Sequence, residues 1–124
     1  MDLLRCENFS LSEFVRGGDA PVDDHLRNLI ALANRLQVVR DTLHKPITIT
    51  SGFRTTEHNK KIGGAVGSLH LHGMAADIQI KDIEPIKVYE RLYTSWSGGL
   101  GLYDQHVHVD VGEYRRWNNQ KRDD

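Results

Sequence analysis

The sequence predicts an α+β fold in which a small antiparallel sheet packs against helices. Two segments, 21–45 and 86–96, place apolar side chains three or four residues apart, which is typical of amphipathic helices. Three others, 47–50, 74–80 and 99–111, are rich in β-branched residues or alternate apolar with polar positions, as strands do. Because both kinds of segment recur along the chain, neither an all-helical nor an all-strand fold fits.

Boundary residues define the first two predicted helices. Ser10 with Glu13 fits a capping box, which should start a short helix over residues 11–15. A longer helix should open at Pro21 and end at Pro46, with two aspartates in its first turn, where the helix dipole favours negative charge. Its apolar stripe should consist of Leu29, Leu32, Ala33, Leu36, Val39 and Leu43.

The middle of the chain contains two predicted strands separated by a long polar segment. Residues 47–50 read ITIT, which is β-branched throughout and indicates a strand. Residues 51–73 are mostly Gly, Ser, Thr, His and Asn with little periodicity, so we expect one long irregular loop, of a length that is usually functional. The strand over 74–80 should bury Ala76, Ile78 and Ile80 and turn Asp77 and Gln79 to the other face.

The last third of the chain predicts one helix and a hairpin. Residues 86–96 form an amphipathic pattern, and residues 99–103 and 106–111 read as two strands. Asp104 and Gln105 between them suit a tight turn. The tail after residue 113 is polar and basic, then acidic, so we expect no element there and a frayed end.

The hairpin carries polar side chains that could bind a metal. In HVHVDV the valines should face the core, which leaves His106, His108 and Asp110 on the opposite face. If the strands share one sheet, Asp77 and His108 converge and a loop histidine can join them. Two imidazoles and a carboxylate, with a fourth position open to water, form the ligand set of a catalytic zinc site. The alternative is a merely solvated strand face.

The composition restricts the class of protein and of partner. The chain has 124 residues, 39% of them hydrophobic and 27% charged, so we expect one globular domain over residues 1–124. A formal charge of −1 gives no electrostatic reason to expect nucleic acid or a membrane surface. No stretch approaches the ~20 apolar residues of a membrane span, and no signal peptide is recognisable, so we expect a protein made in the cytoplasm. We also expect a monomer.

Five short motifs together resemble the M15 family of zinc peptidases. They are SGFRT at 51–55, EHN at 57–59, IGGA at 62–65, SxHxxGxAxD at 68–77, and GGLGLY with HVDVG between 98 and 112. The resemblance extends over residues 8–117 and is greatest to the short single-domain branch. The family includes D-Ala-D-Ala carboxypeptidases and the L-Ala-D-Glu endopeptidases of phage lysins, and it shares a fold with the Hedgehog signalling domain. The resemblance therefore implies a Hedgehog/DD-peptidase-like fold.

Carried over to this sequence, the family pattern implies specific ligands. His70, Asp77 and His108 would bind Zn²⁺, whereas His72 falls at a variable position and is expected to face solvent or a neighbouring ligand. Arg54 matches the family's substrate-binding arginine, whose planar fork of donors suits a peptide carboxylate or carbonyl. A structural salt bridge is the alternative for Arg54.

The sequence departs from the family pattern at the general base. Many relatives place Glu or Asp three residues before the last histidine ligand, but Gln105 stands there and cannot accept a proton at neutral pH. His106 and Asp104 are the two replacements, and we slightly favour His106, because its intrinsic pKa suits the task. Ser51 and Ser68 are candidates for substrate hydrogen bonds, or they could simply hold the loops.

The function implied by the resemblance is zinc-dependent hydrolysis of peptide bonds in the stem or cross-link of peptidoglycan. We expect a phage or prophage endolysin that stays in the cytoplasm until it is released to the cell wall. One alternative is a non-catalytic, zinc-containing wall-binding module, which the glutamine at position 105 favours. Another is a host periplasmic D-Ala-D-Ala carboxypeptidase, which would need an export signal. The bond that is cut is left open.

Overall fold

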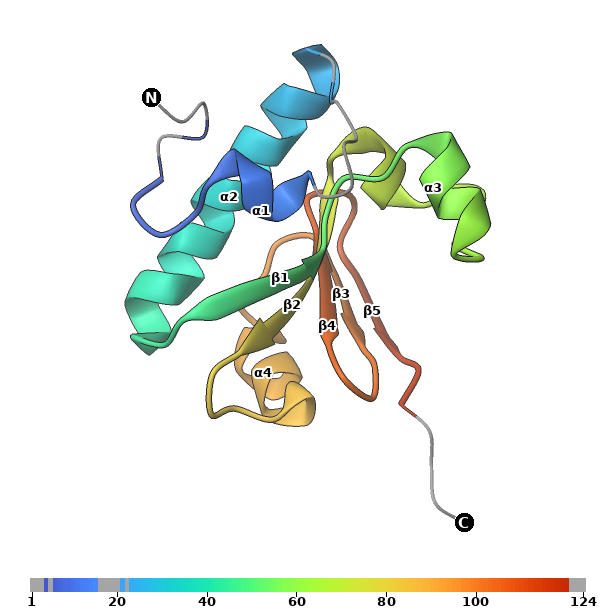
Figure 1. Ribbon diagram of the computed structural model, residues 1–124. Helices are drawn as coiled ribbons and strands as arrows, with labels where there is room; N and C mark the ends of the chain where they lie inside the picture. The colour runs from blue at the N-terminus through green and yellow to red at the C-terminus, as the bar shows by residue number, and fades with distance from the viewer. Residues whose placement is uncertain (1–3, 5, 16–20, 22, 121–124) are drawn as a thin grey trace.

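A computed structural model describes residues 4, 6–15, 21 and 23–120, and this part of the chain has the predicted α+β architecture (Figure 1). Its sheet has five strands in the order β1-β2-β4-β3-β5. The strands are β1 (Ile47–Ser51), β2 (Ala75–Ile80), β3 (Gly99–Leu102), β4 (Val107–Asp110) and β5 (Arg115–Asn118). The pairs β1-β2, β2-β4 and β3-β4 are antiparallel, whereas β5 runs parallel to β3. The sheet is therefore mixed rather than purely antiparallel.

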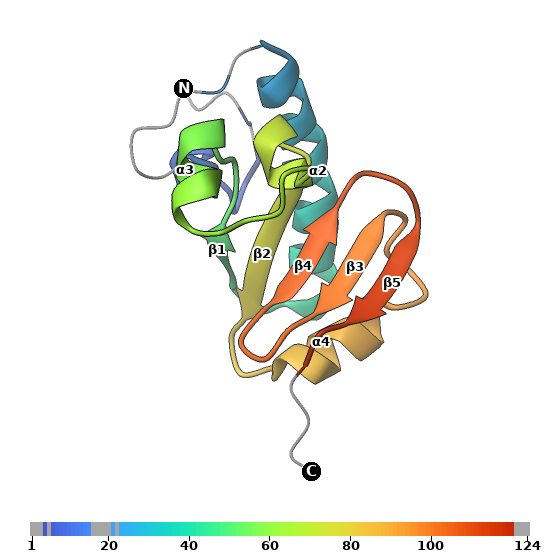
Figure 2. The ribbon, with the colours of Figure 1, turned by 90° about the vertical axis from the view of Figure 1, so that its right-hand side faces the viewer.

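The helices lie on both sides of this sheet. They are α1 (Leu11–Phe14), α2 (Asp23–Leu43), α3 (Thr56–Lys61), the 3₁₀ helix η2 (Leu69–His72) and α4 (Pro85–Leu92). Helices α2 and α4 cover one face, while α3 and η2 lie on the other side, near the ends of β1 and β2 (Figure 1, Figure 2). Among the described residues, no helix has both the length and the apolar character that crossing a membrane requires.

The core lies between α2, α4 and the covered face of the sheet. Helix α2 buries the predicted stripe from Leu29 to Val39, although Leu43 is only partly buried. The valines of β4 face the same core, as the alternation predicts, because Val107 and Val109 are fully buried. The covered face is thus apolar, which leaves the polar side chains of β2 and β4 on the open face.

Three helix boundaries differ from those predicted by two or more residues. Helix α2 begins at Asp23 rather than Pro21, and it ends at Leu43, before His44, whose φ of 55° is left-handed. Helix α4 ends at Leu92 rather than at Trp96. The backbone N–H of Trp96 still donates to the Leu92 carbonyl, at 2.9 Å, so the chain turns once more without continuing the helix. Buried Trp96 extends the apolar pattern past the helix end.

Two expectations about irregular chain were wrong. Residues 51–73 contain two short helices, each started by a capping side chain: Thr55 accepts from the His58 N–H at 3.1 Å, and Ser68 from the His70 N–H at 3.2 Å. Capping compensates there for missing apolar periodicity. The tail likewise forms β5, which its polar composition concealed. The end that we expected to fray, residues 121–124, lies outside the described residues.

Leu36 offers a test of the core. Its side chain is 0% exposed in the middle of α2, so Leu36→Ala should leave a cavity and lower the free energy of unfolding by ~2–5 kcal/mol. The matched control is Val38→Ala on the same helix, since Val38 is 65% exposed and should cost little. Urea denaturation followed by circular dichroism measures both. Equal losses would contradict the assignment of the buried face.

Candidate metal centre

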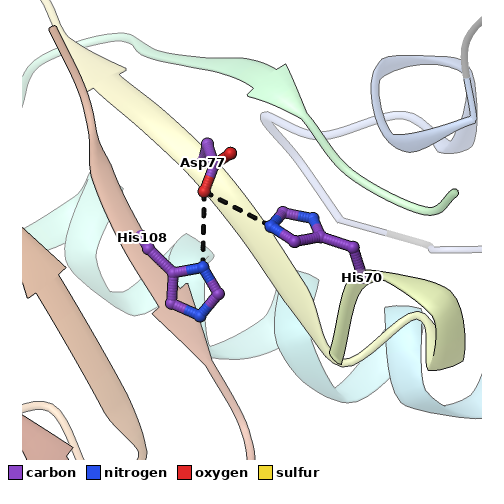
Figure 3. Close-up of side chains that lie close together, drawn as sticks. All are labelled: His70, Asp77 and His108. Carbon is purple, nitrogen blue, oxygen red and sulfur yellow. Dashed lines mark ion pairs between the residues drawn. The ribbon is translucent and has the colours of Figure 1, made fainter. Parts of the chain in front are cut away.

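Three elements bring His70, Asp77 and His108 together on the open face of the sheet (Figure 3). Asp77 on β2 and His108 on β4 are direct cross-strand partners, and η2 brings His70 beside them. Oδ1 of Asp77 lies 3.4 Å from Nε2 of His70 and 3.4 Å from Nδ1 of His108. One possible ligand atom from each residue lies within 4.8 Å of the other two. The cluster can therefore hold a single metal ion.

A backbone carbonyl fixes the ring of His70. Its Nδ1 lies 2.8 Å from the carbonyl oxygen of Gly52, so Nδ1–H donates there and Nε2 keeps its lone pair toward Asp77. Gly52 itself packs against the backbone of Phe14, where a Cβ would come within 2.6 Å of the Phe14 oxygen. The close approach of these segments thus requires glycine and sets the orientation of the buried imidazole.

A buried carboxylate fixes the ring of His108. Oδ2 of Asp110, which is 0% exposed, lies 2.8 Å from Nε2 of His108 and leaves Nδ1 toward Asp77. Oδ1 of Asp110 accepts from the N–H groups of Gly99 and Gly112, at 2.9 and 3.0 Å. An imidazole held this way by a carboxylate is the usual arrangement behind metal-binding histidines. Asp110 therefore orients the ring of His108.

The two carboxyl groups at this site, Asp77 of the cluster and Asp110 behind His108, both have lowered pKa values, which favours their ionised forms. Burial alone would raise the pKa of Asp77, but its contacts with the imidazoles of His108 and His70 outweigh burial and hold the pKa well below its usual range. The same balance lowers the pKa of Asp110, through His108 and the two glycine N–H groups. Burial lowers the pKa of His108, yet its two carboxylate partners raise it overall. Ionised Asp77 therefore offers an anionic ligand atom to a cation bound in the cluster.

A pocket of about 390 Å³ opens beside the cluster. It is lined by Arg54, Ala65, Gly67, Ser68, Leu69, His70, Asp77, Tyr103, His106, His108, Arg115 and Trp117. This pocket is mixed in polarity and contains every predicted metal ligand. A second hollow of about 300 Å³, between α2 and the end of α4, is lined by neither histidine nor carboxylate.

Arg54 lies at the edge of the cluster and is largely satisfied by neighbours. Its guanidinium donates to Ser51 Oγ at 3.1 Å, to Asn59 Oδ1 at 3.3 Å and to Asp77 Oδ2 at 3.4 Å. Burial lowers its pKa, and the Asp77 charge acts in the opposite direction. Ser51 therefore positions Arg54, whereas Ser68 caps η2 and also lines the pocket.

The structure places the two candidate bases differently. His106 lines the pocket with Nε2 3.7 Å from Asp77 Oδ1, and its ring stacks on Tyr103 at 4.6 Å. Burial lowers the pKa of His106, and the charge of Asp77 only partly offsets this. Asp104 lies exposed on the turn and outside the pocket lining, as does Gln105. His72 is also exposed and contributes no atom to the cluster.

Among the pocket residues with charged or aromatic side chains, the sequence analysis missed three: Tyr103, Arg115 and Trp117. The last two come from β5, which was not predicted. The signal that could have found them is the alternation of β5, because Arg115 and Trp117 line the pocket while Arg116 donates to the Gly98 carbonyl elsewhere. The alternation was not visible in the pattern of apolar residues, because Arg115 and Arg116, two consecutive arginines, are both polar.

The chain is similar to a known protein family and to curated relatives. Residues 7–110 match the family model described as Peptidase M15. The zinc D-Ala-D-Ala carboxypeptidase of Streptomyces albus G is 29% identical over 123 residues, 90% of this chain and 48% of that protein. The peptidoglycan L,D-endopeptidase MepK of Escherichia coli K12 is 32% identical over 90 residues, 67% of this chain and 49% of its own. The chain thus spans about half the length of these relatives. It belongs to the Peptidase M15 family.

Proposed function

We propose that this chain is a zinc peptidase that hydrolyses peptide bonds in the stem or cross-link of peptidoglycan. The observation that carries the proposal is the cluster of His70, Asp77 and His108 at the pocket wall, with His106 beside it. The names of the two relatives, a zinc carboxypeptidase and a peptidoglycan endopeptidase, support the metal and the substrate.

The residues present fit zinc. Ligand atoms ~2.0–2.2 Å from a tetrahedral zinc ion lie ~3.3–3.6 Å apart. Asp77 Oδ1 lies 3.4 Å from each of the two histidine nitrogens. Two histidines and one carboxylate are a ligand set of catalytic sites, because structural zinc sites are closed and richer in cysteine. When bound, zinc supplies a Lewis acid that polarises the scissile carbonyl and activates a water molecule.

His106 is the residue that we assign as general base. Its lowered pKa keeps the imidazole neutral at pH 7, so Nε2 can accept a proton from the attacking water. The same nitrogen can then return the proton to the leaving amine. Stacking on Tyr103 holds the ring in place, and Asp110 acts as a positioning residue through His108. Asp104, the alternative base, is a turn residue farther along the hairpin.

The proposal extends to the cellular setting in which the protein acts. The resemblance to the short branch favours a monomeric, single-domain phage or prophage endolysin that acts from the cytoplasm after release to the wall. Co-expression with a holin tests this setting, because lysis should then require both the holin and an intact His108. Lysis with the chain alone would point instead to a host wall enzyme.

Muropeptide analysis tests the proposed activity. Purified peptidoglycan is incubated with the zinc-loaded protein, and the soluble products are identified by mass spectrometry. New termini at one kind of peptide bond, absent when a chelator is present, are the expected result. Binding to peptidoglycan without new termini would support the alternative of a non-catalytic wall-binding module.

Arg54 offers a separate test of substrate binding. Arg54→Lys keeps a positive charge near Asp77 but loses the planar fork, so we expect kcat/KM to fall ~10- to 100-fold with zinc content unchanged. Zinc content by mass spectrometry and steady-state kinetics on a released stem peptide measure the two effects. If the variant instead loses zinc or its melting temperature drops sharply, Arg54 is a structural ion-pair partner of Asp77.

A further inference from the structure

Strand β5 forms the wall of the pocket opposite Arg54, and it starts after residue 110, where the family match ends. Its side chains alternate, so that Arg115 and Trp117 face the pocket. Arg116, between them, donates to the carbonyls of Gly98 and Trp96. This wall therefore presents a cation, Arg115, beside an aromatic ring, Trp117.

Trp117 is fixed against the strands beside it. It pairs with Gly101 across the parallel β3-β5 ladder, and a Cβ at position 101 would collide with the indole ring. The indole Nε1 donates to the Tyr103 hydroxyl at 3.0 Å, and the ring centre lies 5.1 Å from that of His108. A glycine on β3 thus allows Trp117 to lie flat and close to the metal cluster.

Arg115 is held by one ion pair and one ring. Its Nη2 donates to Asp110 Oδ2 at 3.2 Å, and its guanidinium carbon lies 4.9 Å from the centre of the Trp117 ring, within cation–π range. Among the described residues, Asp110 is the one polar partner of this side chain, which is 53% exposed. Most of its five N–H donors are therefore available to a ligand.

Arg54, on the opposite wall, has more hydrogen-bond partners than Arg115. Its Nε, Nη1 and Nη2 donate to Ser51, Asn59 and Asp77 respectively. The acid inside the pocket, Asp77, is already engaged by the two histidines. A ligand in this pocket therefore meets the guanidinium of Arg115, which is held in orientation but still has N–H donors without a partner among the described residues. The group that a planar guanidinium binds best is a carboxylate or phosphate, in a bidentate arrangement.

We propose that Arg115, stacked on Trp117, binds a free carboxylate of the substrate on the residue next to the scissile bond. This inference rests on the proposed function. Arg115 contacts Asp110, and Asp110 contacts the ring of His108 in the cluster. Only these two side chains therefore separate Arg115 from the middle of the cluster. A peptide residue spans only ~3.3–3.6 Å, so a carboxylate at Arg115 belongs to a residue close to the bond at the metal. The favoured substrates are thus peptides with a carboxylate at that position.

Binding of matched peptides tests the proposal without requiring turnover. Two pairs are used with zinc-loaded protein: an acyl-D-Ala-D-Ala peptide and its C-terminal amide, and an L-Ala-D-Glu peptide and its α-amide. Titration calorimetry should show the free acid of at least one pair bound ~10- to 100-fold more tightly than the amide. That preference should disappear in Arg115→Ala and persist in Arg91→Ala, which removes the same charge from α4.

Two outcomes overturn the proposal: no preference in either pair for the wild-type chain, or a preference that survives in Arg115→Ala. Zinc content is measured in parallel, because Asp110 keeps three other partners in the variant and zinc should be retained. Loss of zinc together with the preference would show that Arg115 acts through Asp110 instead. Arg115→Lys, which keeps the charge beside Asp110, should also lose most of the preference.

The proposed function can fail separately from this inference. If the wild-type chain binds the acids preferentially but releases no muropeptide, the peptidase proposal fails while Arg115 remains a carboxylate-binding residue. If muropeptides are released and the acids and amides bind equally, the peptidase proposal stands and the role of Arg115 is wrong.

Discussion

Replacing His108 by alanine should remove zinc from the protein and abolish hydrolysis of peptidoglycan. In the proposed ligand set His108 supplies one of three ligand atoms, and its Nδ1 lies 3.4 Å from Asp77 Oδ1. If a zinc site worth ~10–16 kcal/mol is divided among its ligands, losing one of them should weaken binding by ~10²-fold or more. Metal content after dialysis, measured by mass spectrometry, and product release from peptidoglycan report the two losses. We expect the same result for His70→Ala and Asp77→Ala.

The matched control for this prediction is His72→Ala. His72 lies two residues from His70 on the same 3₁₀ helix, but it is exposed and contributes no atom to the cluster. The variant should therefore keep its zinc and most of its activity. Full zinc occupancy in His108→Ala would refute the ligand set, and zinc loss in His72→Ala would show that the wrong histidine of η2 had been assigned.

Replacing His106 by alanine should lower kcat by at least ~10²-fold while zinc is retained, since a positioned general base contributes ~10²–10⁴ in rate. His106 faces the pocket, whereas exposed Asp104 does not line it, so Asp104→Ala should cost much less. Single-turnover kinetics on a released stem peptide separates chemistry from product release. Each variant serves as the control for the other.

Three results would change the assignment of the base. An inactive Asp104→Ala together with an active His106→Ala would make the aspartate the base. Loss of zinc in His106→Ala would make His106 a fourth ligand. Zinc content is therefore measured in this variant, because His106 Nε2 lies only 3.7 Å from Asp77 Oδ1. Full activity in both variants would mean that the reaction needs no protein base from this hairpin.

The pairing of Asp77 with His108 was predictable because side chains alternate along strands. Once β2 and β4 share a sheet, the apolar positions fix which side chains face the core, and Asp77 and His108 follow on the open face. By contrast, spacing alone could not choose between His70 and His72. That choice depends on two contacts. Ser68 caps η2 locally, and the carbonyl of Gly52, 18 residues before His70, accepts from the imidazole of His70.

Other features of the site could not be read from the sequence because they depend on tertiary contacts. Strand β5 has little apolar character, and what holds it is the parallel ladder to β3, the fit of Trp117 on Gly101 and the bonds of Arg116 to backbone carbonyls. Similarly, α3 is a six-residue helix whose buried member is Asn59, which binds Arg54 and the Ala65 carbonyl. A search for apolar periodicity misses both elements.

Measuring peptidoglycan hydrolysis while zinc is added to the metal-free protein tests most directly whether cleavage depends on a metal held by His70, Asp77 and His108. Metal-free protein is prepared by chelation, zinc is added in known amounts, and muropeptide release is measured at each point. We expect no release without zinc, a rise that saturates at one zinc per chain, and no rise in His108→Ala. Release that is unchanged in the metal-free protein, or that zinc restores equally in His108→Ala, would contradict this dependence.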